Sequence, residues 1–333
     1  MMIVTRNDVA KAAGVSPGVV SYVLNSGPRP VAPATRQRVL DAVSALGYLP
    51  DGLARSLRTG QSDTLGVILP DAANPFFAEL ARSIEDAAYS SGKSVFVCNS
   101  ADDLARERKY LGTLVEKRVD GIILVSTSGE EDLNDVLSVR IPIVAMDRYR
   151  LQASISTVRF DNSHAGDLAT THLVEHGHSQ IHMIGGPISA AVSDERIVGY
   201  RRAMRRSGLQ PLDVCSAPFT FEAGYKAATT LLDREGSTTA IVCSSDVQAI
   251  GAAAALHEHG ALTPADIALT SIDGTSIGRF MRPDLTTIKQ PTTRMAKLAV
   301  EAVLRPETET HHVLMGRLVV GRSCGCAQAH VPE

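Results

Sequence analysis

Several short apolar runs in this chain are followed directly by charged side chains that could bind a small polar molecule. The charged residues in these positions are Asp147, Arg148, Asp246 and Asp273. Each carboxylate can accept hydrogen bonds from a pair of neighbouring hydroxyls, and an arginine offers five donors in a planar fork. This chemistry suits a polyhydroxylated ligand such as a sugar or a nucleoside.

The sequence contains none of the common motifs of α/β enzymes. Residues 185–187 read Gly-Gly-Pro and invite comparison with a phosphate loop, but neither G-x-G-x-x-G nor G-x-x-x-x-G-K-[ST] occurs. No nucleophile, base and orienting acid can be assembled from the motifs either. We therefore predict that the protein is not an enzyme and that it carries no cofactor.

Cysteines and histidines, the usual ligands of structural zinc, occur here in two pairs. Cys324 and Cys326 form a C-x-C pair, and His172 and His176 stand four residues apart on one face of a predicted helix. The C-x-C pair lacks the second ligand pair that zinc requires, and no glutamate follows His172 to complete H-E-x-x-H. We therefore predict no metal site. The five scattered cysteines are typical of a reducing compartment.

The elements that must position the charged residues are apolar runs of strand length. They cover residues 65–69, 95–98, 121–125, 143–146, 181–184, 240–243 and 267–270. Runs that are continuously apolar indicate strands covered on both faces, and helix-like segments lie between them. This pattern predicts parallel α/β sheets, which bind small molecules at the carboxyl ends of their strands.

The first 49 residues have a different pattern, which predicts short helices with well-defined ends. Thr5 and Asp8 can cap a first helix, because their spacing is that of a capping box. Ser16 is a good N-cap for a second helix, and Pro17 suits its first position. Two short helices joined by a glycine-containing turn are typical of a helix-turn-helix, whose second helix enters the DNA major groove.

A shared apolar core supports three helices in this segment. A third helix is expected over about residues 34–46, followed by Gly47 as its C-terminal glycine. The expected core residues are Val9, Ala10, Ala13, Val15, Val20, Val23, Leu24, Val39, Ala42, Val43 and Leu46. A plain helical bundle is the alternative interpretation.

The charge distribution favours DNA binding over a plain bundle. Residues 1–60 hold seven basic and three acidic side chains, a net charge of +4, whereas the whole chain has −3. Residues 61–333 therefore carry −7. Positive charge is concentrated where phosphates would lie.

Short strings of residues between positions 8 and 57 carry a resemblance to one known family. They are Asp8-Val9-Ala10, Ala13-Gly14-Val15-Ser16, Val20-Ser21, Asn25, Thr35-Arg36 and Leu46-Gly47-Tyr48. Together they resemble the headpiece of the LacI/GalR transcription repressors. Residues 50–57 resemble the hinge helix of that family, which orders on operator DNA and wedges a leucine into the minor groove. Leu57 occupies the position of that leucine.

The resemblance implies a double-stranded operator as the partner and a set of DNA-binding residues. They are Thr5, Ser16, Pro17, Gly18, Val19, Ser21, Tyr22, Asn25, Arg29, Thr35, Arg36 and Leu57. Pro17 and Gly18 depart from the family pattern, because relatives commonly place polar base-reading side chains there. Base readout then depends on the other residues of the second helix. Arg29 is a candidate phosphate contact, and a solvated loop arginine is the alternative.

For residues 64–333 the resemblance implies two periplasmic-binding-protein-like (type I) lobes with doubly wound parallel sheets and an effector between them. It implies effector contacts by Asn74, Phe76, Asp147, Arg148, Arg196, Phe219, Asp246, Asp273 and Gln290. Alternative roles are a helix cap for Asp246, a salt bridge to Asp194 or Glu195 for Arg196, and ordinary core packing for Phe219. Residues 188–192 lack the polar groups of purine-binding relatives, so a sugar or related polyol is expected.

These observations combine into one prediction. Residues 1–49 form an all-α helix-turn-helix headpiece, residues 50–63 a hinge helix and linker, and residues 64–333 an α/β effector-binding and dimerisation domain. A homodimer is expected, because a pseudo-palindromic operator needs two headpieces. The protein would be an allosteric repressor in the cytoplasm, since neither a signal peptide nor a membrane span is visible. The alternative is a cytoplasmic sugar or nucleoside receptor without operator function.

Overall fold

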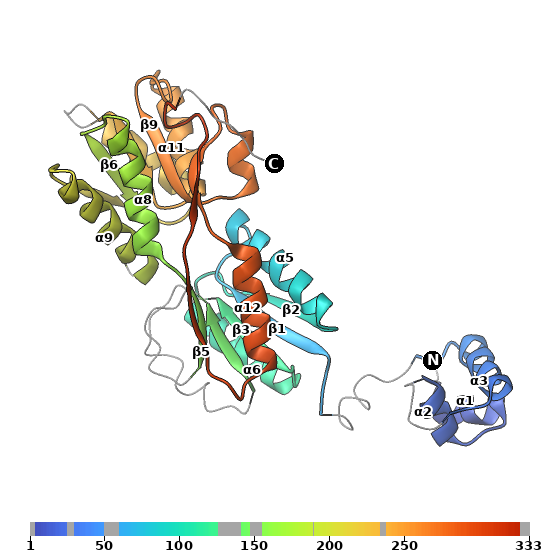
Figure 1. Ribbon diagram of the computed structural model, residues 1–333. Coiled ribbons are helices and arrows are strands. Elements are labelled where there is room, and N and C mark those ends of the chain that lie inside the picture. The colour runs from blue at the N-terminus through green and yellow to red at the C-terminus, as the bar shows by residue number, and fades with distance from the viewer. Residues whose placement is uncertain are drawn as a thin grey trace. The chain divides into compact units, whose positions relative to one another are not determined.

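The structure, a computed structural model, describes residues 4–24, 30–49, 60–125, 141–146, 155–188, 190–233 and 238–326. The chain divides into two compact units, Met1–Ser62 and Asp63–Glu333. Figure 1 labels the elements of both units. Five of the predicted site residues lie outside the described residues: Asn25, Arg29, Leu57, Asp147 and Arg148.

The first unit contains the three predicted helices, α1 (Arg6–Ala13), α2 (Pro17–Leu24) and α3 (Pro33–Leu46). The prediction that the second helix begins at Pro17 is confirmed. Asp8 Oδ2 accepts hydrogen bonds from the Thr5 backbone N–H at 2.8 Å and from its hydroxyl at 2.6 Å, which fixes the start of α1.

The helices of the first unit share one small apolar core. Its buried residues are Val9, Ala10, Ala13, Val20, Val23, Val39 and Ala42. Val15, Leu24 and Val43 pack at its edge and are only partly buried. Leu46 was expected in this core but is 37% exposed, because it lies in the last turn of α3, next to the C-cap Gly47.

The second unit contains two six-stranded sheets, one in each lobe. The first has the order β11-β5-β4-β3-β1-β2, and the second has the order β12-β10-β9-β8-β6-β7. The first consists of β1 (Thr64–Leu69), β2 (Ser94–Asn99), β3 (Gly121–Val125), β4 (Ile143–Met146), β5 (Ser156–Phe160) and β11 (His311–Leu314). The second consists of β6 (Ile181–Gly185), β7 (Val214–Ser216), β8 (Ala240–Cys243), β9 (Ala268–Asp273), β10 (Thr286–Lys289) and β12 (Arg317–Val319). All pairs are parallel except β10 with β12.

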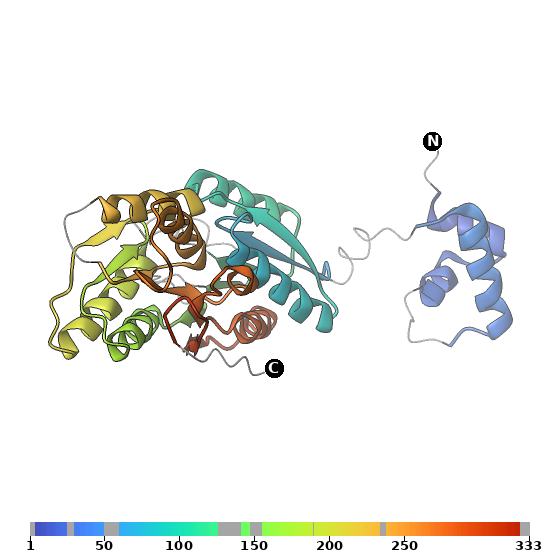
Figure 2. The same ribbon diagram turned by 90° about the horizontal axis from the view of Figure 1, so that it is seen from above.

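Helices cover the sheets, and the chain passes from lobe to lobe three times. The first lobe has α5 (Pro75–Ser90), α6 (Leu104–Glu116) and α12 (Thr292–Leu304). The second has α8 (Asn162–Glu175), α9 (Ala191–Arg206), α10 (Phe221–Leu232), α11 (Asp246–Glu258) and the 3-10 helix η2 (Ser276–Phe280). The passages join β5 to α8, β10 to α12 and β11 to β12. Figure 1 shows the chain passing between the two lobes, and Figure 2 shows the two lobes from above. Among the described residues, no helix is both long and apolar enough to span a membrane.

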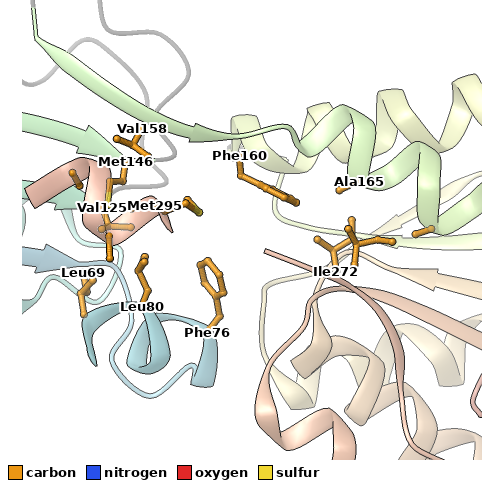
Figure 3. Close-up of a cluster of buried hydrophobic side chains, with 14 of the residues drawn as sticks. Leu69, Phe76, Leu80, Val125, Met146, Val158, Phe160, Ala165, Ile272 and Met295 are labelled. Carbon is orange, nitrogen blue, oxygen red and sulfur yellow. The ribbon is translucent and has the colours of Figure 1, made fainter. Parts of the chain in front are cut away.

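An apolar cluster accompanies the first passage between the lobes. In Figure 3, Leu69, Leu80, Val125 and Met146 belong to the first lobe, whereas Ala165 and Ile272 belong to the second. Phe160, at the end of β5, is 1% exposed and lies between these two groups. The passage is therefore part of the packed core.

The seven predicted strands are all present, and five others were missed. The missed strands are β5, β7, β10, β11 and β12, which are short, polar or alternating in burial. One expectation is wrong, because β2 is an edge strand and is not covered on both faces. Its side chains Phe96 and Val97 are 53% and 51% exposed.

Candidate effector-binding and DNA-binding sites

Close packing of α8 against α9 buries Arg196 in the interior of the second lobe. A Cβ at Gly166 would overlap the carbonyl oxygen of Arg196, and a Cβ at Gly199 would overlap that of Ser163. Glycine at both positions lets the two helix backbones touch, although it lowers intrinsic helix stability. The result is that Arg196 is only 5% exposed.

The Arg196 guanidinium is surrounded by groups from α8, from β9 and from the segments that follow β7 and β8. Its Nε donates to Asn162 Oδ1 at 2.8 Å, and its Nη1 donates to the Ser244 carbonyl oxygen. The same Nη1 lies 3.8 Å from Asp273 Oδ1. The Phe219 ring centroid is 5.8 Å from the Arg196 Cζ, a cation-π distance.

The adjacent Glu195 bonds elsewhere. Its Oε1 lies 3.0 Å from Arg159 Nη2. The partners described for Arg196 are therefore those of the second lobe and not its sequence neighbours.

Asp273 stands at the carboxyl end of β9 with a φ of 134°, a value that is unusual for any residue except glycine. Its Oδ1 accepts from Gln290 Nε2 at 3.0 Å, and its Oδ2 accepts from the Asp246 backbone N–H at 3.3 Å. Burial, with the neighbouring Asp246 charge, raises the pKa of Asp273 to about 8, although Arg196 opposes the shift.

Asp246 is fully buried at the first position of α11, and its carboxylate bonds only inward among the described residues. Oδ1 accepts from the hydroxyls of Ser271 at 2.6 Å and Thr287 at 2.7 Å. Oδ2 accepts from both the N–H and the hydroxyl of Thr275 at 2.7 Å. Burial raises the pKa of Asp246, and these hydrogen bonds oppose the shift. Asp246 therefore holds the surrounding segments together, and its backbone N–H positions the Asp273 carboxyl.

Three buried polar atoms around Arg196 have no hydrogen-bond partner among the described residues. They are Gln290 Oε1, Ser193 Oγ and Ser244 Oγ. Buried polar atoms are almost always satisfied, and leaving one unpaired costs about 1–3 kcal/mol. Such atoms can form hydrogen bonds with a polar ligand.

The first lobe contributes Asn74 and Phe76 at the beginning of α5. Asn74 Oδ1 accepts from the Phe76 backbone N–H at 3.0 Å, so this side chain caps the helix. Phe76 is 5% exposed and lines a cavity of about 470 Å³ together with Glu79, Asp273 and Gln290. The cavity thus brings together three of the predicted effector residues from both lobes.

Sequence reasoning missed Asn162, Ser193 and Gln248. Gln248 is fully buried, and its Nε2 donates to the carbonyl oxygens of Gly185 and Ala217, both at 3.0 Å, which fixes two loops near Phe219. Asn162 could have been found, since it follows a strand end, but β5 itself was not predicted. Ser193 and Gln248 lie inside helices and gave no signal.

In the first unit, the predicted DNA-binding residues that are described lie near the starts of α1 and α3 and along α2. Ser16 and Gly18 are exposed, and Val19, Ser21 and Tyr22 are partly exposed along α2. The Val19 backbone N–H donates to Ser16 Oγ at 3.4 Å, which marks the start of α2. The remaining members, Thr5, Pro17, Thr35 and Arg36, are also accessible in this unit. Helix N-termini offer free N–H groups that bind phosphates.

Two segments of the chain match the sequence patterns of known protein families. The sequence pattern of "Bacterial regulatory proteins, lacI family" matches residues 5–51. The pattern of "Periplasmic binding proteins and sugar binding domain of LacI family" matches residues 62–310. The chain belongs to the LacI family.

Relatives of this LacI-family chain extend over nearly its whole length. The HTH-type transcriptional repressor PurR of Aliivibrio salmonicida is 35% identical and covers 92% of this chain and 93% of its own. The ribose operon repressor of Escherichia coli K12 is 34% identical, with the same shares covered. The expected resemblance is thereby confirmed.

Solved structures of LacI-family proteins share the fold. A lac repressor dimer bound to operator and the anti-inducer ONPF superposes with a TM-score of 0.89 at 27% identity, covering 97% of this chain and 99% of its own. The transcriptional regulator CelR in complex with cellobiose gives 0.71 at 29% identity, covering 96% and 99%. The predicted helix-turn-helix headpiece with two type I lobes is confirmed, and the chain is a DNA-binding transcriptional regulator.

Proposed function

We propose that this LacI-family regulator is a homodimeric repressor whose affinity for a pseudo-palindromic operator changes when a small polyhydroxylated effector binds between its lobes. The observation that carries the proposal is the cluster around Arg196, where a guanidinium and the Asp273 carboxyl accompany three polar atoms that have no hydrogen-bond partner in the part of the chain that the structure describes. A ligand with several hydroxyls can satisfy these atoms, because each hydroxyl both donates and accepts.

The chemistry of the cavity favours a sugar or related polyol. Gln290 and Asp273 line the cavity and can accept hydrogen bonds from hydroxyls. Arg196, whose Nη1 lies 3.8 Å from Asp273 Oδ1, would donate to a ligand that reaches past Asp273. Phe76 and Phe219 provide apolar ring surface near these polar groups. The relatives are named HTH-type transcriptional repressor PurR and ribose operon repressor, and a nucleobase is the competing ligand class. The apolar residues near Gly186, such as Ala190 and Val192, favour the sugar.

Operator binding is assigned to α2 and the helix starts of the first unit. Ser16, Val19, Ser21 and Tyr22 would read base edges, and Thr5, Thr35 and Arg36 would contact phosphates. We assign residues 50–63 to the hinge and linker, with Leu57 as the minor-groove wedge. Such a protein acts in the cytoplasm and works by binding, not by catalysis.

An exposed apolar edge supports the homodimer. Phe96 and Val97 on the edge strand β2 are half exposed, and Tyr89 near the end of α5 is 83% exposed. Large apolar side chains grouped at a sheet edge are typical of a surface that another chain covers. A second copy is the natural partner, because two headpieces are needed for one two-fold operator.

The test joins a ligand screen to a DNA-binding measurement. Sugars, nucleosides and small acids are screened by thermal shift, and an operator is selected from random duplexes. Fluorescence anisotropy then measures operator affinity with and without each hit. We expect a sugar or polyol to bind and to change operator affinity by about 5- to 150-fold, the usual range of allosteric coupling.

Arg196→Ala should abolish the ligand response and keep operator binding. The matched control is Arg201→Ala, an exposed arginine on the same helix α9. A ligand response that survives in Arg196→Ala refutes the assigned site. Failure to select any operator favours the alternative, a receptor that binds its ligand without controlling transcription.

A further inference from the structure

Four side chains from two distant segments converge at the C-terminal end of α8. Cys326 Sγ lies 2.9 Å from His176 Nε2, 3.4 Å from His172 Nε2 and 3.1 Å from Cys324 Sγ. The ligand atoms of His172, Cys324 and Cys326 all lie within 4.8 Å of one another. No second ligand pair lies near the C-x-C pair in the sequence, but the fold brings His172 and His176 to it, and His176 lies 150 residues before Cys326.

We propose that His172, His176, Cys324 and Cys326 form a tetrahedral Cys2His2 site for one zinc-class divalent cation. With Zn–S of about 2.3 Å and Zn–N of about 2.0 Å, tetrahedral geometry requires S···S of about 3.8 Å and S···N of about 3.5 Å. The three separations from Cys326 Sγ lie within about 1 Å of these values. His176 contacts Cys326 but lies outside the group of three residues whose ligand atoms are all within 4.8 Å of one another. His172, Cys324 and Cys326 are therefore already gathered around one point, and a rotation of the His176 side chain would complete the site.

The His176 ring is oriented so that its Nε2 can bind a metal ion. His176 Nδ1 lies 2.6 Å from the His172 carbonyl oxygen. Because a carbonyl oxygen only accepts, Nδ1 carries the proton, and in the neutral ring Nε2 presents its lone pair to Cys326 Sγ. A second hydrogen bond of this kind is the usual support of metal-binding histidines.

The cysteine side is anchored to the sheet. Ser323, immediately before Cys324, is fully buried, donates to the Leu269 carbonyl oxygen at 2.8 Å and accepts from the Thr286 N–H at 2.9 Å. Thr286 Oγ1 accepts from the Gly321 N–H at 2.9 Å and donates to Cys324 Sγ at 3.0 Å. The sulfur of Cys324 is thus placed by β9 and β10.

Local backbone and charge are consistent with a bound dication. Gly325 has a φ of 86°, a left-handed value that glycine adopts at little cost and that turns the chain between the two cysteines. Two thiolates with two neutral imidazoles would balance the two positive charges of the ion.

The site is separate from the effector cluster but belongs to the same helix. α8 begins at Asn162, which bonds Arg196, and its last turn carries His172. A cation would fasten the segment after β12 to α8. This inference does not rest on the proposed effector or operator, and its test is independent of both.

The test is a metal titration of the full chain after reduction and removal of metal with a chelator. We expect one Co2+ per chain with a thiolate-to-cobalt charge-transfer band, displaced by Zn2+ at one equivalent. X-ray absorption of the zinc form should show two sulfur and two nitrogen ligands, with a Zn–S distance of about 2.3 Å. Cys326→Ser and His176→Ala should each weaken Zn2+ binding by at least about 100-fold, since even outer-shell changes cost 10- to 100-fold.

Two matched variants control for cysteine and histidine loss elsewhere. Cys215→Ser removes a partly buried thiol from β7, and His259→Ala removes the C-cap histidine of α11, whose Nδ1 bonds the Ala255 carbonyl oxygen as His176 does in α8. Both should bind Zn2+ like the wild type. Equal affinity in all four variants, no stoichiometric binding, or two cysteines found only as a Cys324–Cys326 disulfide would overturn the proposal.

Discussion

Ser276 donates both its backbone N–H, at 2.8 Å, and its hydroxyl, at 2.6 Å, to Oε1 of Glu79. Glu79 is on α5 in the first lobe and Ser276 begins η2 in the second, so one carboxylate joins the two lobes. Glu79 also lines the cavity that contains Phe76, Asp273 and Gln290. Closure of the lobes and access to the cavity therefore involve the same side chain.

Glu79→Ala should weaken effector binding by about five- to tenfold. Hydrogen bonds to a charged group contribute about 1.5–3 kcal/mol, solvent exposure of Ser276 reduces this value, and 1.4 kcal/mol corresponds to a factor of ten. Isothermal titration with the ligand found in the screen measures the effect. Glu85→Ala, exposed on the same helix, should bind like the wild type. Unchanged affinity in Glu79→Ala would show that this link does not stabilise the liganded state.

Asp273→Asn should remove a pH dependence of stability. The folded-state pKa of Asp273 is raised by burial to about 8 from the ordinary value of 3.8, so its stability contribution is complete below pH 4 and is lost as pH rises towards 8. The free energy of unfolding of the wild type should fall relative to the variant by at most about 1.4 kcal/mol per pH unit. Urea unfolding between pH 4 and 8 measures it, with Asp86→Asn as control. Parallel curves would contradict the shift.

Gly199→Ala should destabilise the second lobe by about 2 kcal/mol or more, since the new methyl group meets backbone atoms of α8 and overpacking typically costs about 1–3 kcal/mol. Chemical unfolding measures the loss. Gly112→Ala in α6 is the control, because nothing lies within 4 Å of its Cβ position. It should leave stability unchanged or raise it by up to about 1 kcal/mol. A loss in both variants would mean that helix contact is not the cause.

Phe96→Ser should dissociate the dimer, because it removes a large apolar side chain from the exposed edge strand β2. Sedimentation velocity at micromolar concentration should show at least a tenfold weaker self-association. Val313→Ser alters β11 at the opposite edge of the same sheet and should have no effect, although Val313 is 60% exposed. A monomeric wild type would contradict the homodimer. Dissociation only by Val313→Ser would place the interface at the opposite edge of the sheet.

Leu57→Ala should weaken specific operator binding well below the wild type and leave effector affinity nearly unchanged. The reason is the loss of an apolar wedge whose insertion bends the duplex. Anisotropy on the selected operator and on an unrelated duplex separates specific from non-specific binding. Operator affinity of both proteins should fall steeply with salt, because phosphate contacts release counterions. Equal operator affinity of variant and wild type would contradict the wedge.

Local sequence patterns were sufficient for the headpiece and for most of the sheets. The capping pair Thr5 and Asp8, the start of α2 at Pro17 and the glycine that ends α3 depend on contacts within a few residues. The strand ends also placed Asp273 correctly, because the carboxyl ends of parallel strands share one edge. The polar strand β10 was not predicted, since its burial comes from neighbours on both sides and not from its own composition.

Residue types and spacing along the chain were enough to predict the family and the helix-turn-helix, and they indicated which residue types to expect at an effector site. Only the tertiary structure decided how these residues are used. It buries Asp246 among four hydrogen bonds beneath Asp273, leaves Phe96 exposed at a sheet edge, and brings His176 to Cys326. The physical reason is that sequence patterns report the surroundings within one element, whereas hydrogen-bond partners and metal ligands are chosen by packing between elements far apart in the chain.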